Sequence, residues 1–360
     1  MIRKTYLASR LLLVLAIVMM GSCAKQAYYI DAKSEHKSSG EYLIQWDVRP
    51  GMVGEVAIYA SKDAVLYPQE PFIVEDISKE TTIYDSSDQG FSQTYFLLVF
   101  NNLESRVASS RIIPTQGIVN LRDVGGYMTG GGEQMRWGRL YRSGDLHRIK
   151  DMDRYTIASL GIQSHYILSP SRLSPNDPIP SLGISTLNSW YIAPDVEIDF
   201  QQTLDDIYSG KLSKNSITYF KKDIFNSIAF ENPHQISMIL HSLIDPNNYP
   251  VLLSDDLGKD RVAFIIMLVQ HIMGVCRADI INEYVLSNQL LPVEILEPKG
   301  HKEPVAIQEA LTEFFRCEAN QINSIISEIE NRYGNINNYL DQHLHFDAKD
   351  QAYLRQVLLY

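Results

Sequence analysis

Apolar and polar residues alternate with a period of two from Glu41 onward, which is typical of β-strands. In the run EYLIQWDV, one face carries only apolar side chains, namely Tyr42, Ile44, Trp46 and Val48. Similar runs follow at 55–59, 71–74, 81–84, 94–100 and 107–113, and turn signals such as RPGMVG and SSDQG separate them. Six short strands in succession predict a small all-β sandwich over 41–114, with Trp46 and Tyr95 in its core.

Beyond residue 117 the pattern changes to helical spacing interrupted by short apolar runs. Strands are predicted at 162–168 and 251–253, and helices at 151–160, 199–230, 234–244, 261–275, 278–290, 304–315, 320–332, 336–343 and 348–358. Asp151 is a plausible N-cap and Gly161 a C-cap of the first helix. This order predicts an α/β domain with a mostly parallel central sheet over 117–360.

The run YPVLLSDDLGKDRVAF, residues 249–264, combines a buried strand, a tight polar loop and a long apolar helix. In such a unit, backbone N–H groups and the positive end of a helix dipole point at one spot, which favours anion binding. By itself, the stretch is more simply interpreted as an ordinary strand-to-helix turn.

Composition narrows the function classes. The chain has 360 residues, of which 45% are hydrophobic and 21% charged, with a formal net charge of −11. That length allows two domains with sizeable cores. The acidic balance and the lack of a long Lys/Arg block argue against a nucleic-acid partner.

The first residues have the features of an export signal. Arg3 and Lys4 precede an apolar run, 11–20, that is too short to span a bilayer, and Met-Gly-Ser-Cys follows at 20–23. The small residues before Cys23 resemble a bacterial lipobox; the alternative is a plain secretory signal. We expect a signal peptide over 1–22, acylation of Cys23, a polar tether over 23–40, and a protein held by lipid in the bacterial cell envelope. Cys276 and Cys317 are expected to be free and buried.

The sequence pattern does not decide the functions of two segments. The segment 41–114 resembles an immunoglobulin or fibronectin type III module in pattern only, so a spacer or a protein-docking module is expected. The segment after the junction at 114–117 is rich in glycine and arginine, a residue suited to bidentate phosphate binding. Its arginines are Arg122, Arg136, Arg139 and Arg142. They are more simply read as partners of Asp123, Glu133 and Asp145 in structural salt bridges.

Five motifs in order resemble the bacterial tyrosine/phosphoinositide phosphatase family, whose chemistry depends on cysteine. They are NLRDVGGY at 120–127, RWGRLYRSGDL at 136–146, PVLLSDDLGKDR at 250–261, EYVLSN at 283–288 and YGNINNYL at 333–340. The family's loop resembles HCxxGKDRTG. There the Cys thiolate attacks phosphorus, the Arg holds the phosphoryl oxygens and the Asp is the general acid. The resemblance covers 117–360 and implies no cofactor and no metal.

Carried over by position, this loop keeps Gly258, Lys259, Asp260 and Arg261 but lacks the nucleophile. Asp255 stands at the Cys position and Ser254 at the His position, and Asp256 and Leu257 complete the loop. Val262 and Ala263 replace the Thr-Gly that follows the Arg. A second motif, DLRS in the family, also loses its charges, with Ile167 and Ser169 at the Asp and Arg positions. Arg122, Asp123 and Arg142 are expected to support the loop.

The resemblance therefore implies an impaired pseudophosphatase that binds a phosphorylated ligand or a protein partner. We expect the Asp255 carboxylate to take the place of phosphate, accepting the loop N–H groups and pairing with Arg261. One alternative is an active phosphomonoesterase that uses Asp255 as nucleophile, or a Mg²⁺ ion held by Asp255, Asp256 and Asp260. Another is an envelope protein that makes its contacts through the β module.

Overall fold

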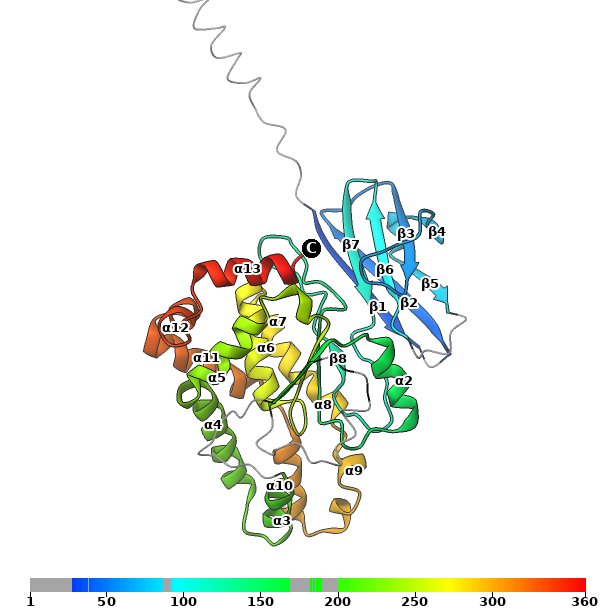
Figure 1. The fold of residues 1–360 in the computed structure, drawn as a ribbon. Helices are drawn as coiled ribbons and strands as arrows, with labels where there is room; N and C mark the ends of the chain where they lie inside the picture. Colours follow the sequence, from blue (N-terminus) through cyan, green and yellow to red (C-terminus); the bar gives the residue numbers. More distant parts are fainter. Residues whose placement is uncertain are drawn as a thin grey trace, which may run out of the picture.

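The computed structural model describes residues 28–37, 39–86, 92–168, 182, 184, 186–189 and 200–360. It consists of an N-terminal all-β sandwich beside a larger α/β domain (Figure 1). The predicted signal peptide, Cys23 and Ser169 lie outside the described residues. Among the residues that are described, no helix is both long enough and apolar enough to cross a bilayer.

The sandwich consists of two antiparallel sheets, ordered β1-β2-β5 and β4-β3-β6-β7. Its strands are β1 (Tyr29–His36), β2 (Glu41–Arg49), β3 (Glu55–Ser61), β4 (Ile73–Asp76), β5 (Thr81–Asp85), β6 (Tyr95–Phe100) and β7 (Glu104–Ser109); a 3-10 turn, η1, spans Ile77–Lys79. The core lies between the sheets and includes Trp46, as predicted. Tyr95 is buried elsewhere, at the junction with the second domain.

The predicted tether is wrong over Tyr29–His36, because β1 pairs along its whole length with β2. The segment is polar, but Ile30 and Ala32 alternate with charged residues and are buried in the sandwich core. Two apolar positions were too weak a pattern to indicate a strand. The sandwich therefore begins twelve residues earlier than the sequence pattern suggested.

The two domains are joined by specific contacts along β7. The side chain of Gln134 pairs with the backbone of Val107 on both its N–H (3.0 Å) and its carbonyl (2.9 Å), and Trp137 Nε1 donates to the same carbonyl at 2.8 Å. The hydroxyls of Tyr95 and Tyr141 lie 3.1 Å apart. These buried hydrogen bonds fix the sandwich against the α/β domain.

The α/β domain is built on a five-stranded sheet ordered β11-β10-β12-β9-β8. The first four strands are parallel, and β8 is antiparallel to β9, so the predicted mostly parallel sheet is confirmed. Its strands are β8 (Arg122–Asp123), β9 (Leu140–Ser143), β10 (Ser164–Ile167), β11 (Thr186–Ser189) and β12 (Val251–Ser254). The central position of β12 brings the loop that follows it to the middle of the sheet edge.

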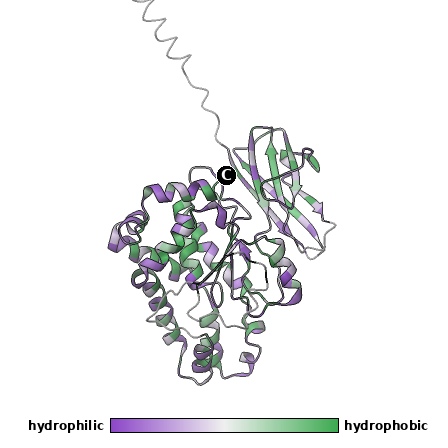
Figure 2. Cartoon of the chain, viewed as in Figure 1, coloured by the Kyte–Doolittle hydropathy of each residue, from purple (hydrophilic) through white to green (hydrophobic). Residues whose placement is uncertain are grey.

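Many helices surround this sheet. They are α2 (Asp151–Ser159), α3 (Phe200–Tyr208), α4 (Lys214–Glu231), α5 (Pro233–Ser242), α6 (Asp260–Met273), α7 (Arg277–Val285), α8 (Ser287–Leu290), α9 (Val293–Leu296), α10 (Val305–Phe315), α11 (Ala319–Tyr333), α12 (Ile336–Gln342) and α13 (Ala348–Leu358), with 3-10 turns η3 (Pro246–Asn248) and η4 (Gly300–Lys302). Most of the outer helices mix hydrophilic and hydrophobic residues (Figure 2), as amphipathic helices do. Helix α6 is buried nearly all round.

Several helix boundaries differ from the predicted ones because of local glycine and capping residues. The predicted helix 199–230 is two helices, because Gly210 adopts φ +74° and Ser213 then caps α4 through its side chain. Asp151 is the first residue of α2 and Lys150 occupies the N-cap position, while Gly161, at φ +62°, follows the C-cap Leu160. Both cysteines are free as expected, but Cys276 is exposed, since it precedes α7 at the surface.

Candidate active site

The candidate site is the loop between β12 and α6, residues 254–261, at the carboxyl end of the sheet. Gly258 adopts φ +66° there, and a Cβ at this position would lie 2.3–2.6 Å from the backbone of Ser143 and Gly144. Only glycine fits this close approach. The loop is thereby held against the end of β9, and its amides are directed inward at the N-terminus of α6.

The Asp255 carboxylate lies inside the ring of loop amides and is almost completely buried. Its Oδ1 accepts hydrogen bonds from the backbone N–H groups of Leu257 (3.1 Å), Gly258 (2.6 Å) and Lys259 (3.2 Å). Its Oδ2 accepts one from the N–H of Val262, in the first turn of α6, at 3.0 Å. A carboxylate at a helix N-terminus with four N–H donors is a well-stabilised anion.

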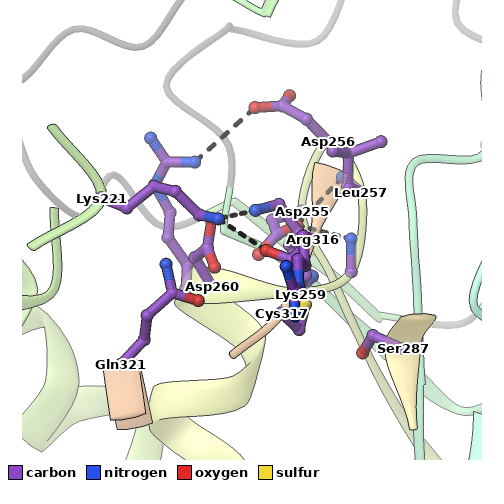
Figure 3. Close-up of polar contacts among 12 residues, drawn as sticks. Lys221, Asp255, Asp256, Leu257, Lys259, Asp260, Ser287, Arg316, Cys317 and Gln321 are labelled. Atoms are coloured by element: carbon purple, nitrogen blue, oxygen red, sulfur yellow. Dashed lines mark hydrogen bonds and ion pairs between the residues drawn. The ribbon is translucent and has the colours of Figure 1, made fainter. Parts of the chain in front are cut away.

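The space in front of the loop is small. Phe200, Ile224 and Phe314 line, together with loop residues, a pocket of only about 30 Å³. Arg261 lines this pocket, and its Nη1 lies 3.6 Å from Oδ2 of Asp256. The ion pair that we expected between Arg261 and Asp255 is thus replaced by one to the neighbouring carboxylate, which Figure 3 shows on the outer side of the loop.

A second cluster of charges lies beside the loop. Lys259 Nζ is 2.9 Å from Oδ2 of Asp260, and the hydroxyl of Tyr284 donates to Oδ1 of Asp260 at 3.1 Å. Burial alone would raise the pKa of Asp260, but Lys259 and Lys221 outweigh it and hold this pKa below its usual value. Asp260 is therefore ionised at neutral pH. Burial raises the pKa of the neighbouring Cys317 thiol, which keeps it uncharged.

Lys221 approaches the loop from α4 (Figure 3). Its ammonium donates to the carbonyl oxygens of Glu313 and Arg316, both at 2.6 Å. Burial, together with repulsion from Lys259, lowers the pKa of Lys221 to about 8. The ammonium groups of Lys221 and Lys259, near the pocket, are thus bound by groups of the protein itself.

Behind the loop, a buried polar wall fixes its carbonyl groups. The Asn120 amide donates to the carbonyls of Leu257 (2.9 Å) and Gly258 (2.8 Å). Arg142 Nη2 donates to the carbonyls of Gly258 and Lys259. Because these carbonyls point backward, the N–H groups of the same peptides point forward into the site.

Glu283 of α7 is the acidic centre of this wall. Its Oε1 lies 2.8 Å from Arg122 Nε and 3.3 Å from Arg142 Nη1, and its Oε2 accepts from the Tyr127 hydroxyl at 2.7 Å. Burial would raise the pKa of Glu283, but Arg122 and Arg142 lower it below its usual value. Arg122 also donates to Oδ1 of Asn120, so the wall is continuous from α7 to the loop.

The predicted supporting residues have different positions. Arg122 and Arg142 support the loop from behind, paired with Glu283 rather than with the acids nearby in sequence. Asp123 lies in another part of the domain, where its carboxylate accepts the N–H groups of Gly125 (2.7 Å) and Gly138 (2.8 Å). Burial raises the pKa of Asp123 to about 6. Asp123 therefore braces the β8–β9 connection.

Other arginines of this segment also lie away from the loop. Arg136 donates to the carbonyl of Leu359, and the guanidinium of Arg139 lies over the ring of Tyr249. Ser254 ends β12, and its hydroxyl lies 2.7 Å from Nε2 of His165 on the neighbouring strand. Burial lowers the pKa of His165 to about 3, so its ring is neutral. A histidine is therefore present beside the loop, on β10 rather than on β12.

Sequence reasoning missed Asn120, Glu283 and Ser287 as parts of the site. Ser287 Oγ accepts from Arg122 Nη2 at 3.1 Å. All three residues fall inside motifs that carry the resemblance, NLRDVGGY and EYVLSN. The motifs indicated that these positions matter, but nothing in their spacing indicated that α7 folds back against β8.

The three aspartates of the loop do not form a metal centre. Asp255 faces loop amides, Asp256 faces Arg261, and Asp260 faces Lys259 and Tyr284. Across the described part of the chain, no group of three or more His, Cys, Asp or Glu side chains is arranged to hold a metal ion.

Comparisons with known proteins place this geometry in context. Residues 113–360 match the model of the "Tyrosine phosphatase family". The chain is 24% identical over 237 residues to a presumed tyrosine-protein phosphatase of Cupriavidus necator, covering 64% of this chain and 83% of that protein. It is 28% identical over 194 residues to the triple specificity protein phosphatase PtpB of Mycobacterium tuberculosis, covering 49% of this chain and 69% of that protein.

Among solved structures, the chain is similar to the core catalytic domain of the PP-IP phosphatase SIW14 from S. cerevisiae. The sequence identity is 15% and the TM-score is 0.30, with 60% of this chain and 94% of that chain covered.

Proposed function

Because the chain belongs to the tyrosine phosphatase family, we propose that its α/β domain is a catalytically impaired member that binds or regulates instead of hydrolysing phosphate esters. One observation carries the proposal: the Asp255 carboxylate occupies the ring of loop amides and accepts four of their N–H groups. The loop keeps an anion-binding shape, and a side chain of the protein supplies the anion.

Electrostatics explains why this residue opposes a substrate. A phosphate bound at the loop would lie about 4 Å from the Asp255 carboxylate, and two such charges repel by roughly 4 kcal/mol at an effective dielectric constant of about 20. If protonation or Arg261 relieved half of this, phosphate would still bind about 30-fold more weakly. The small volume of the pocket in front of the loop supports the same conclusion.

The general acid is compromised as well. At the position of the family's acid, Asp260 is held ionised by Lys259 and Lys221. An ionised carboxylate has no proton to give to a leaving oxygen. Val262 follows Arg261 where the family has a hydroxyl residue. In the nucleophile, the acid and the loop hydroxyl, the site thus differs from that of the family.

Hydrolysis through Asp255 as nucleophile is less well supported. Both of its carboxylate oxygens are engaged by loop amides, and an aspartyl-phosphate route normally depends on a bound Mg²⁺. Asp255, Asp256 and Asp260 face different partners, which does not suit such an ion. A phosphorylated ligand would therefore meet the domain outside the loop, or a protein partner would bind it.

The proposal extends to where the protein acts. A basic start, a short apolar run and Met-Gly-Ser-Cys support export and acylation at Cys23, with lipid anchoring in a bacterial cell envelope. In that setting the α/β domain would act on ligands or partners at the membrane.

Restoring the thiol tests the proposal. The parent protein, Asp255→Cys and the matched control Asp255→Ser are assayed on an aryl phosphate, each with and without Mg²⁺. We expect no turnover by the parent under either condition, and measurable turnover by Asp255→Cys alone, because only a thiol gains a depressed pKa at this helix N-terminus. Turnover by the parent, or a Cys variant that binds and cleaves no better than the parent, would contradict an intact but filled site.

A further inference from the structure

The sandwich begins close to the proposed acylation site. Strand β1 starts at Tyr29, six residues after Cys23. Six residues span at most about 20 Å even when fully extended. If Cys23 carries lipid, the end of the sandwich where β1 begins must therefore lie within that distance of the membrane.

Strand register identifies the loops at this end. Tyr29 pairs with Arg49, the last residue of β2, and Val56 near the start of β3 pairs with Phe100, the last residue of β6. The β2–β3 connection, 50–54, and the β6–β7 turn, 101–103, therefore lie at the end where β1 starts (Figure 1).

The side chain of Asn101 ties these two loops together. Its amide donates to the carbonyl of Val53 at 3.0 Å, and its oxygen accepts from the N–H of Glu55 at 2.9 Å. Asn101 itself has a positive φ of 50°, a conformation that Asn tolerates better than most residues. The two loops thus form one fixed tip.

Apolar side chains stand out from this tip. Val53 is 94% exposed and Leu103 is 65% exposed. A single exposed apolar residue needs no explanation, but these two stand on adjoining loops at the end nearest the anchor.

We propose that this tip, with Val53 and Leu103 at its apex, lies against the lipid surface and orients the protein on the membrane. The proposal rests on the proposed acylation of Cys23. Charges around the tip are mixed, with Arg49 paired to Asp47 and with Glu55 and Glu104 beside the loops. The tip therefore suits a neutral, zwitterionic headgroup layer, and contact does not require anionic lipid.

Fluorescence quenching on vesicles tests the orientation. The full acylated chain, with exposed Cys276 changed to Ser, is labelled through Leu103→Cys or through the matched control Leu66→Cys. Leu66 is 71% exposed and lies in the β3–β4 connection at the opposite end of the sandwich. Both proteins are bound to phosphatidylcholine vesicles that carry a quencher at headgroup depth, and iodide serves as the aqueous quencher.

We expect the label at 103 to be quenched several-fold more by the lipid-borne quencher than the label at 66, and to be correspondingly protected from iodide. If both labelled chains float with the vesicles but show equal quenching, the orientation is wrong while the lipid anchor stands. If the chains fail to float with vesicles, as the unacylated Cys23→Ser control should, the anchor and the orientation both fail.

Discussion

The two sides of the loop between β12 and α6 differ in which charged groups contact the loop. Behind the loop, Arg122 and Arg142 both pair with the carboxylate of Glu283, and Arg142 also donates to the loop carbonyls. In front, the loop amides face the carboxylate of Asp255, which the resemblance places where a nucleophile would stand. The residues behind the loop fix the shape of an anion-binding site. In front of the loop, the Asp255 side chain supplies the anion.

The residues that hold the loop in its conformation are therefore different from the residue at 255, where the chemistry of the family takes place. The back wall draws residues from β8, β9 and α7, so that changing one member leaves other buried charges without partners. The residue at 255 faces the pocket, and a different anion there can satisfy the same amides. A loop of this kind can therefore lose its chemistry and keep its conformation.

The largest effect is expected from breaking the back wall. Glu283→Ala leaves Arg122 and Arg142 buried without their acid, which should lower the free energy of unfolding by roughly 3–5 kcal/mol. Chemical denaturation measures this. The matched control is Glu330→Ala, which removes the exposed partner of Arg277 and should cost no more than about 1 kcal/mol. Equal losses for the two variants would mean that the wall does not support the loop.

A smaller loss of stability is expected at the front. Asp255→Asn replaces an acceptor-only carboxylate with an amide whose NH₂ faces loop N–H donors, so at least one charge-assisted hydrogen bond is lost. This should cost about 1.5–3 kcal/mol of unfolding free energy. Asp256→Asn, one residue along on the outer side of the loop, is the comparison in the same denaturation experiment. If Asp256→Asn were the more destabilising, Asp255 would not be the anion that the loop amides hold.

The pH dependence of stability should separate the carboxyl groups by direction. Glu283 and Asp260 have lowered pKa values in the fold, so the stability they contribute is present above their unfolded values, near 4, and is lost as the pH falls through the folded ones. Asp123 acts in the opposite sense. Its pKa is raised to about 6, so its contribution is lost as the pH rises from about 4 to 6.

Denaturation at a series of pH values checks these signs. Asp123→Asn should remove the loss of stability between about pH 4 and 6 and leave the acid limb below pH 4 unchanged. If the slope between pH 4 and 6 persists in this variant, Asp123 is not the group that titrates there.

The sequence predicted the parts of this account that depend on local pattern. Alternating apolar residues indicated the sandwich, and the run from Val251 to Leu253 followed by an apolar helix indicated the unit that carries the loop. Position-by-position comparison with the family also predicted that the Asp255 carboxylate would accept loop amides. Each of these features is encoded within a few neighbouring residues.

Features that depend on residues far apart in the chain were not predictable in the same way. Glu283 reaches Arg122 across 161 positions, and no spacing rule links them. Strand β1 was mistaken for a tether because its apolar pattern consists only of Ile30 and Ala32. The backbone pairing with β2, which also stabilises this strand, cannot be seen in its own sequence. Arg261 was expected to pair with Asp255, but side-chain directions at the start of α6 bring it to Asp256.

Calorimetric titration with tungstate, a phosphate-like oxyanion, tests the central claim most directly. Asp255→Ala removes the internal anion and leaves the loop amides unfilled, so this variant should bind tungstate at least about 30-fold more tightly than the parent, which corresponds to about 2 kcal/mol. Asp256→Ala serves as the control and should not gain comparably. Equal and weak binding by the parent and Asp255→Ala would show that the loop holds no anion site for Asp255 to fill.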